Sequence, residues 1–284
     1  MAGVKALQDV ELARFWEEFA SVMGGEDGLM TYRYLGTSAT ALNPKKAEGS
    51  LRLRSDMRTE YGLQVAPLGI LVADVVGILA DAVSVPAPTQ MDITILDDGV
   101  GVQEVHCTSQ LLHAGRTMLF GKSVLVDAAT PERVLAVCRD SAAVMAVAPE
   151  GYQYVPPGPG VADSGNLPPL WQAFGARHRT RGGFELPSLT SRLGSTSGSL
   201  HHGPTQVIME ATALEKAAGA VGHDRLRLTN WHVSFIARGK TGPFISNARV
   251  ASVTDQQVAI DVELHETAAG RMIASGTAVF ARLP

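Results

Sequence analysis

Residues 67–83 read PLGILVADVVGILADAV, a stretch that would be apolar on every side of a helix except at Asp74 and Asp81. It is shorter than the ~20 residues that a membrane-spanning helix needs, and two aspartates make it too charged for one. Pro67 suits the first turn of a helix, where its missing N–H costs nothing. The stretch therefore predicts a helix buried on all sides inside a globular protein.

Strand patterns surround this helix. Residues 50–57 alternate apolar and polar side chains, as in a half-buried strand. Four further strand candidates follow the helix, separated by turn-forming segments at hairpin spacing: residues 91–96, 102–112, 118–126 and 134–144. The sequence predicts a strand, a buried helix and then an antiparallel meander.

The same order returns after residues 146–170, a segment rich in proline and glycine that we interpret as a linker. It is followed by a strand at 183–189, a helix at 204–220, and strands at 225–236, 244–252, 257–265 and 271–281. Glu210 stands at the position of Asp74, 136 residues later. We therefore expect two copies of one unit, residues 31–145 and 171–284.

An amphipathic helix is expected in the N-terminal segment, residues 1–30. Residues 9–23 place apolar side chains on one face at helical spacing, with Asp9 as N-cap and two glycines after the last turn. The favoured interpretation is that this face packs on the body of the protein, and a lid over a substrate mouth is the alternative.

Composition excludes several classes of protein. With 45% hydrophobic and 18% charged residues and a mean hydropathy of +0.09, the 284-residue chain is not disordered. A net charge of −4 and a pI near 6.1 leave no basic stripe, so we expect no nucleic-acid partner. No basic-then-apolar leader and no basic membrane anchor is visible, which predicts a cytoplasmic protein without a membrane partner.

The two cysteines, Cys107 and Cys138, lie in apolar stretches and are expected to be small buried hydrophobes rather than a disulfide or zinc ligands. His201 and His202 have no E-x-x-H or H-x-H companion. We therefore expect no metal and no cofactor.

The carboxylates of Asp74 and Glu210 are the first candidates for function. Burying a carboxylate in an apolar helix costs several kcal/mol unless it is paired, protonated or used in chemistry. Because the two acids occupy equivalent positions, chance is a weaker explanation for either one. The alternative is structural: each would accept hydrogen bonds from neighbouring backbone and fix the packing register.

The residues before the second helix are the next candidates. Residues 200–204 read LHHGP, which puts two imidazoles and free backbone amides at the positive end of a helix dipole. An oxyanion or a polarised carbonyl is stabilised there. His201, His202 and Gly203 are thus candidate binding or catalytic residues.

At this point the pattern resembles a known family. A strand, a turn, an H-G-G-like loop, a long helix with an acid nine positions after the first histidine, and four antiparallel strands are similar to the PaaI-type acyl-CoA thioesterases. His201-His202-Gly203 stands at the H-G-G position, Glu210 at the acidic position, and Ser195 where asparagine is frequent. The resemblance covers both halves and implies an α+β double hotdog, each half a long buried helix wrapped by an antiparallel sheet.

In that family a site forms between two hotdogs, from the histidine loop of one and the acid of the other. The resemblance implies one working site, in which Asp74 is opposite the second histidine loop, and one degenerate site, in which Glu210 is opposite Val65 and Ala66. The residues assigned by the resemblance are Asp74, His201, Ser195 and Glu210 as catalytic, and His202, Gly203, Gln90 and Asn230 as oxyanion or substrate-binding.

The implied reaction is hydrolysis of an acyl-CoA thioester to the free acid and CoA. Asp74 would act as general base toward a water or as nucleophile, and the amides of His202 and Gly203 would polarise the thioester carbonyl. His201 would orient the thioester or the water, helped by Ser195. Coenzyme A enters only as part of the substrate, and double hotdogs of this kind can associate into homo-oligomers.

Two other interpretations remain. Hotdog dehydratases and hydratases of 3-hydroxyacyl thioesters carry a P-G-x-x-x-x-E-A run, to which residues 204–211, PTQVIMEA, are similar apart from the missing glycine. The other interpretation is a non-catalytic acyl-thioester-binding protein. It is suggested by the first half, which has no histidine at the motif position, and by the second half, which has serine in place of asparagine.

Overall fold

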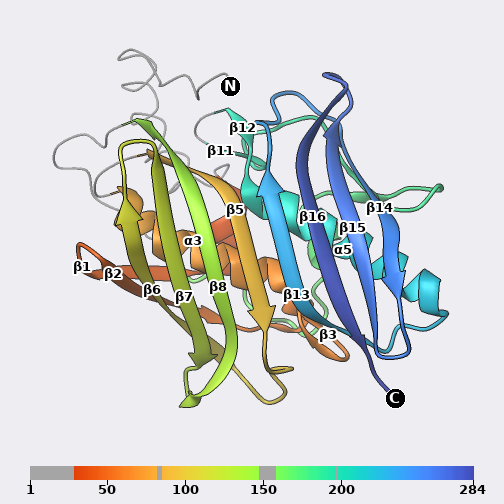
Figure 1. The fold of residues 1–284 in the computed structure, drawn as a ribbon, viewed down its shortest axis with the longest axis horizontal. Helices are drawn as coiled ribbons and strands as arrows, with labels where there is room; N and C mark the ends of the chain where they lie inside the picture. Colours follow the sequence, from red (N-terminus) through yellow and green to blue (C-terminus); the bar gives the residue numbers. More distant parts are fainter. Residues whose placement is uncertain (1–28, 82–84, 147–157, 196–197) are drawn as a thin grey trace.

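The computed structural model describes residues 29–81, 85–146, 158–195 and 198–284 (Figure 1). In this part of the chain one antiparallel sheet of 12 strands runs across the whole molecule, in the order β1-β2-β6-β7-β8-β5-β13-β16-β15-β14-β10-β9. Two long helices, α3 (Val65–Asp81) and α5 (His202–Val221), lie together behind one face of this sheet. The predicted N-terminal helix lies outside the described residues.

The first half contains one long helix and a four-stranded meander after it. Its elements are α2 (Met30–Leu35), β1 (Ser38–Asn43), β2 (Lys46–Arg52), η1 (Ser55–Met57), β3 (Arg58–Thr59), β4 (Gly62–Leu63), α3, β5 (Val85–Ile95), β6 (Glu104–Ala114), β7 (Met118–Asp127) and β8 (Thr130–Ala146).

The second half repeats the strand hairpin, the helix and the meander. Its elements are α4 (Leu170–Ala173), β9 (Arg177–His178), β10 (Phe184–Leu186), β11 (Gly194–Ser195), β12 (Ser199–Leu200), α5, β13 (Leu226–Phe235), β14 (Phe244–Val253), β15 (Gln257–Glu266) and β16 (Arg271–Arg282). The predicted order of helix and meander is confirmed in both halves, whereas α2 and β1 were not predicted.

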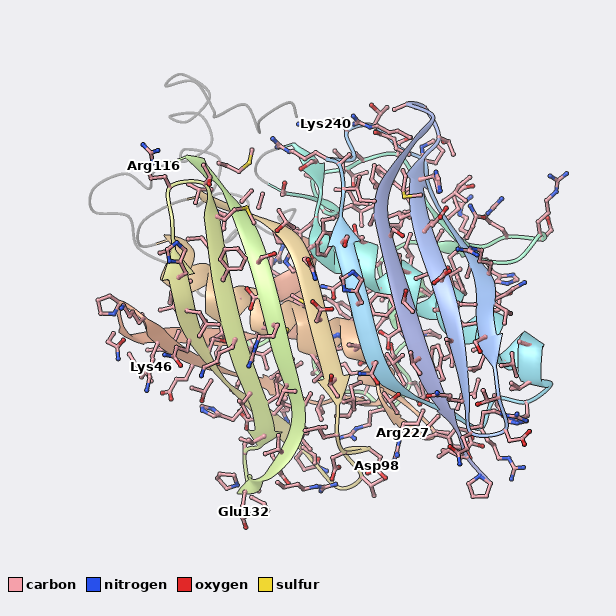
Figure 2. The ribbon with its side chains drawn as sticks, viewed as in Figure 1. Lys46, Asp98, Arg116, Glu132, Arg227 and Lys240 are labelled. Atoms are coloured by element: carbon pink, nitrogen blue, oxygen red, sulfur yellow. The ribbon has the colours of Figure 1, made fainter. Side chains whose placement is uncertain are left out.

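The two halves join edge to edge through β5 and β13, which pair antiparallel. Asp92 of β5 lies opposite His232 of β13 at the centre of this pairing. At one end of the junction Arg227 forms an ion pair of 3.8 Å with Asp98, and Figure 2 shows both residues at the lower ends of these central strands. The result is a continuous sheet with an approximate twofold relation between its halves.

Helix α3 is buried as its sequence predicts. None of the apolar side chains in its first two turns is exposed, and Asp74 is only 4% exposed. Cys107 and Cys138 are also buried, and burial raises the pKa of both thiols, that of Cys107 to about 12. None of the helices in the described ranges is long and apolar enough to cross a membrane.

Candidate functional site

Glu210 reaches from α5 to the beginning of α3. Its two carboxylate oxygens accept hydrogen bonds from the backbone N–H groups of Val65 (2.6 Å) and Ala66 (2.8 Å). These amides belong to the first turn of a helix, where N–H groups have no acceptor within the helix. A carboxylate is also stabilised by the positive end of the helix dipole. Glu210 therefore occupies the anion site that α3 would otherwise offer.

The register of the two helices places Asp74 opposite the other helix terminus. Glu210 lies at the level of Val65, and one turn earlier in α5 the side chain of Gln206 packs against the Cα of Gly69. Because the helices run antiparallel at about 1.5 Å per residue, one further turn brings His202 level with Ala73, the residue before Asp74. The approximate twofold relation between the halves gives the same placement. We therefore expect Asp74 to lie near the N-terminus of α5.

The two histidines are held in defined orientations. His201 is the N-cap of α5, where its Nδ1 accepts a hydrogen bond from the N–H of Gly203 at 3.3 Å. In His202, Nδ1 lies 3.4 Å from the amide nitrogen of Gln206, and Nε2 lies 3.1 Å from the hydroxyl of Tyr32. If each Nδ1 accepts, the neutral rings carry their protons on Nε2. His202 then donates to Tyr32.

Helix α2 covers the start of α5. The hydroxyl of Thr31 lies 3.1 Å from Nδ1 of His201, and the ring of Tyr32 meets that of His201 edge to face at 5.4 Å. A Cβ on Gly203 would lie 2.3 Å from Cγ2 of Thr31, so glycine is required for this approach. Thr31 and Tyr32 are thus part of the site, and α2 forms one of its walls.

Burial controls the charge of the site. It lowers the pKa of His202 to about 3 and, together with the neighbouring His202, lowers the pKa of His201 well below its usual value. Both imidazoles are therefore neutral near pH 7. Burial raises the pKa of Glu210 to about 7, against the hydrogen bonds from Ala66 and Val65, which favour the charged form.

Ser195 lies in the hairpin of β11 and β12 that precedes α5. Its hydroxyl is 3.2 Å from that of Ser199, which also accepts a hydrogen bond from Arg238 at 3.3 Å. The N–H of His201 binds the carbonyl of Leu193 in the same hairpin. Ser195 is therefore near the helix start in sequence and partly buried, but its described contact is with the hairpin.

Gln90 and Asn230 were expected to bind the oxyanion or the substrate, but the structure does not place them with the other site residues. Both side chains are exposed on the outer face of the sheet, where Gln90 donates to Asp92 at 2.9 Å and Asn230 donates to Thr94 at 3.2 Å. Side chains alternate along a strand, and the neighbouring Met91 is the one that faces the helices. Both residues lie on strands next to the helices, but their side chains point to the outer face of the sheet, away from the helices.

Solved structures share this architecture. The TesB protein of Mycobacterium avium subspecies paratuberculosis matches with a TM-score of 0.62 at 13% identity, over 87% of this chain and 96% of that one. A hotdog-fold protein of unknown function from Alicyclobacillus acidocaldarius matches with a TM-score of 0.56 at 8% identity, over 87% and 96%. The chain adopts the double hotdog fold. Acyl-CoA thioesterase II TesB2 of Mycobacterium marinum matches with a TM-score of 0.55 at 12% identity, also over 87% and 96%. No family model and no curated protein matches the sequence.

Sequence reasoning missed three residues of the site: Thr31, Tyr32 and Gln206. Thr31 and Tyr32 lie about 170 positions before the histidines, and no periodicity links them to α5. Gln206 did carry a signal, because it is a polar residue one turn before Glu210 on the same buried face and has no exposed surface. Its Oε1 has no hydrogen-bond partner in the described part of the chain.

Proposed function

We propose that this protein is an acyl-CoA thioesterase whose working site lies between Asp74 of α3 and the N-terminus of α5. The observation that carries the proposal is the contrast between the two helix termini. At α3 the amides are occupied by Glu210. At α5 the facing acid is Asp74, whose side chain is one methylene shorter.

The shorter acid leaves room for one more group. Where Glu210 contacts amide nitrogens directly, an aspartate at the equivalent place would stop about 1.5 Å short. A water or a thioester carbonyl oxygen can then lie between the carboxylate and the amide of His202, whereas the N–H of Gly203 already donates to Nδ1 of His201. This arrangement supports a PaaI-like division into one open and one closed site.

The chemistry proposed for this site uses neutral histidines. Asp74 takes a proton from the attacking water, or attacks the carbonyl carbon itself, and the α5 amides stabilise the oxyanion that forms. Because its Nδ1 accepts from the N–H of Gly203, His201 presents Nε2–H as a donor to the thioester or water. When water attacks, the C–S bond breaks, the proton held by Asp74 passes to the CoA thiolate, and the free acid is released. When Asp74 attacks, loss of the CoA thiolate leaves a mixed anhydride on Asp74, which a water hydrolyses to release the acid.

The names of the structural neighbours give independent support, since TesB2 of Mycobacterium marinum is described as an acyl-CoA thioesterase. A 3-hydroxyacyl-thioester dehydratase or hydratase and a non-catalytic binder use the same fold and are the alternatives. The dehydratase requires a glycine after the helix proline, where this chain has Thr205.

The test is release of free thiol from a series of acyl-CoAs, followed with a thiol reagent. Asp74→Asn should abolish release, whereas Glu210→Gln should retain much of it, because Glu210 closes the degenerate site. We expect both variants to fold, since an amide of similar size replaces a buried acid.

The opposite ranking of the two variants would refute the assignment of the working site. No thiol release from any acyl-CoA, with a thermal shift on adding CoA, would favour the binding protein. Hydration of a 2-enoyl-CoA without thiol release would favour the dehydratase or hydratase. Loss of folding in both variants would mean that the two carboxylates are structural.

A further inference from the structure

A half-buried acid, to which the described residues donate no hydrogen bond, lies on the inner wall of the first repeat. Asp140 is on β8, in alternation with Cys138 and Ala142, which both face the helices. No hydrogen bond to its carboxylate is formed by the described residues, and its Oδ1 has no exposed surface. Burial raises the pKa of Asp140 to about 6. Such a group is costly unless something uses it.

The neighbouring strand makes room for this carboxylate. Gly121 of β7 pairs with Asp140, and a Cβ on Gly121 would lie 2.5 Å from Oδ1. Any other residue at position 121 would therefore displace the acid. The carboxylate of Asp140 thus occupies the space that Gly121 leaves by having no side chain.

The second repeat lacks this feature. Asp140 lies between Met91 and Gly121, and the equivalent position between Trp231 and Ile260 is Ala278. The fold therefore needs neither the acid nor the glycine, because the same sheet position is filled by alanine and isoleucine in the other half.

The surrounding wall differs in the same way. Next to Asp140 the hydroxyls of Ser109 and Ser123 are 2.7 Å apart and buried. The register places Ala248 and Val262 at these two positions in the second repeat. At these three positions the first repeat thus has polar side chains where the second has apolar ones.

A chain of contacts joins this wall to the proposed working site. Met91 is the strand partner of Asp140. Its Sδ packs against Gly69, 3.0 Å from where a Cβ on that glycine would lie. Gly69 contacts Gln206, which reaches His202. Three successive contacts thus separate Asp140 from the start of α5, and we place the acyl chain of the proposed substrate along this line of side chains.

We infer that Asp140 selects the substrate of the proposed thioesterase, by accepting a hydrogen bond from a hydroxyl group on the acyl chain. The inference rests on the proposed function and names the substrate class of that site: hydroxylated acyl-CoAs. A hydroxyl fits better than an ammonium, because both the ionised and the protonated carboxyl accept from a hydroxyl. An ammonium would also have to lose its hydration in a largely apolar wall.

The experiment compares octanoyl-CoA with isomers that carry one hydroxyl on successive carbons of the octanoyl chain. The variants are Asp140→Ala, which installs the residue of the second repeat, and Asp140→Asn, which keeps one acceptor oxygen. Asp92→Ala, on the outer face of the adjacent strand, is the matched control. The measurement is kcat/KM for thiol release, with circular dichroism as the check of folding.

We expect the wild type and Asp92→Ala to favour one hydroxylated isomer over octanoyl-CoA by about tenfold or more, as for a hydrogen bond to a charged group. Asp140→Ala should lose this preference and still cleave octanoyl-CoA, and Asp140→Asn should keep part of it. If the wild type lacks this preference, or if Asp140→Ala keeps it, the inference about Asp140 would be overturned while the proposed function would stand. If the wild type cleaves none of the thioesters, both the proposed function and this inference would be overturned.

Discussion

Replacing Glu210 by glutamine keeps the size of the side chain and removes its titration. In the folded protein the pKa of Glu210 is raised to about 7 from an ordinary value of 4.5, chiefly by burial. An acid whose pKa is raised in the folded state stabilises the fold fully below the unfolded value. That contribution is lost as pH rises through the folded value, here between 4.5 and about 7.

The size of the effect follows from the same shift. At about 1.36 kcal/mol per pKa unit, the move from 4.5 to about 7 corresponds to about 3 kcal/mol of unfolding free energy. Glutamine contributes no such dependence. It also offers one acceptor oxygen to the two N–H groups of Val65 and Ala66, which leaves one buried donor unpaired at a cost of about 1 to 3 kcal/mol.

Urea unfolding of the wild type and Glu210→Gln at pH 5 and pH 8 measures the difference in unfolding free energy at each pH. All other titrating groups cancel in that difference. The advantage of the wild type should shrink by about 2 to 3 kcal/mol on going from pH 5 to pH 8. A difference that is constant, or that grows with pH, would show that the two amides hold Glu210 ionised despite its burial, and the reasoning would be refuted.

Three further predictions concern the same region and the thiols. Gly203→Ala should destabilise the protein by about 1 to 3 kcal/mol, because the new Cβ would meet Thr31; the double variant with Thr31→Ala should recover part of the loss in a urea titration. The pKa of His202 is lowered to about 3, so its contribution to stability is present above pH 6.5 and lost as pH falls. The wild type should therefore lose about 2 kcal/mol relative to His202→Asn between pH 6.5 and pH 4.5 in acid unfolding, and an equal loss in both would contradict this. The buried thiols of Cys107 and Cys138 should react with a thiol reagent only after denaturation, and rapid reaction of the native protein would contradict their burial.

The sequence could predict the elements that depend on local pattern. The apolar run of α3 requires burial on all sides, and the alternation in the meander strands requires a sheet, so both follow from residue type alone. Repetition of that order, with Glu210 standing where Asp74 stands, predicts two equivalent units. The candidate acids and the loop from His201 to Gly203 were found the same way, because polar residues in an apolar element are conspicuous.

Only the tertiary structure decided which groups meet. No pattern within α5 indicates that Glu210 binds the amides of Val65 and Ala66, since that contact depends on how two helices cross. The face of Gln90 depends on a strand register that a shift of one residue reverses. The role of Asp140 emerges only when its pairing with Gly121 is set beside that of Ala278 with Ile260. Sequence determines what each element must bury, whereas distances between remote side chains are set by packing, which local pattern does not encode.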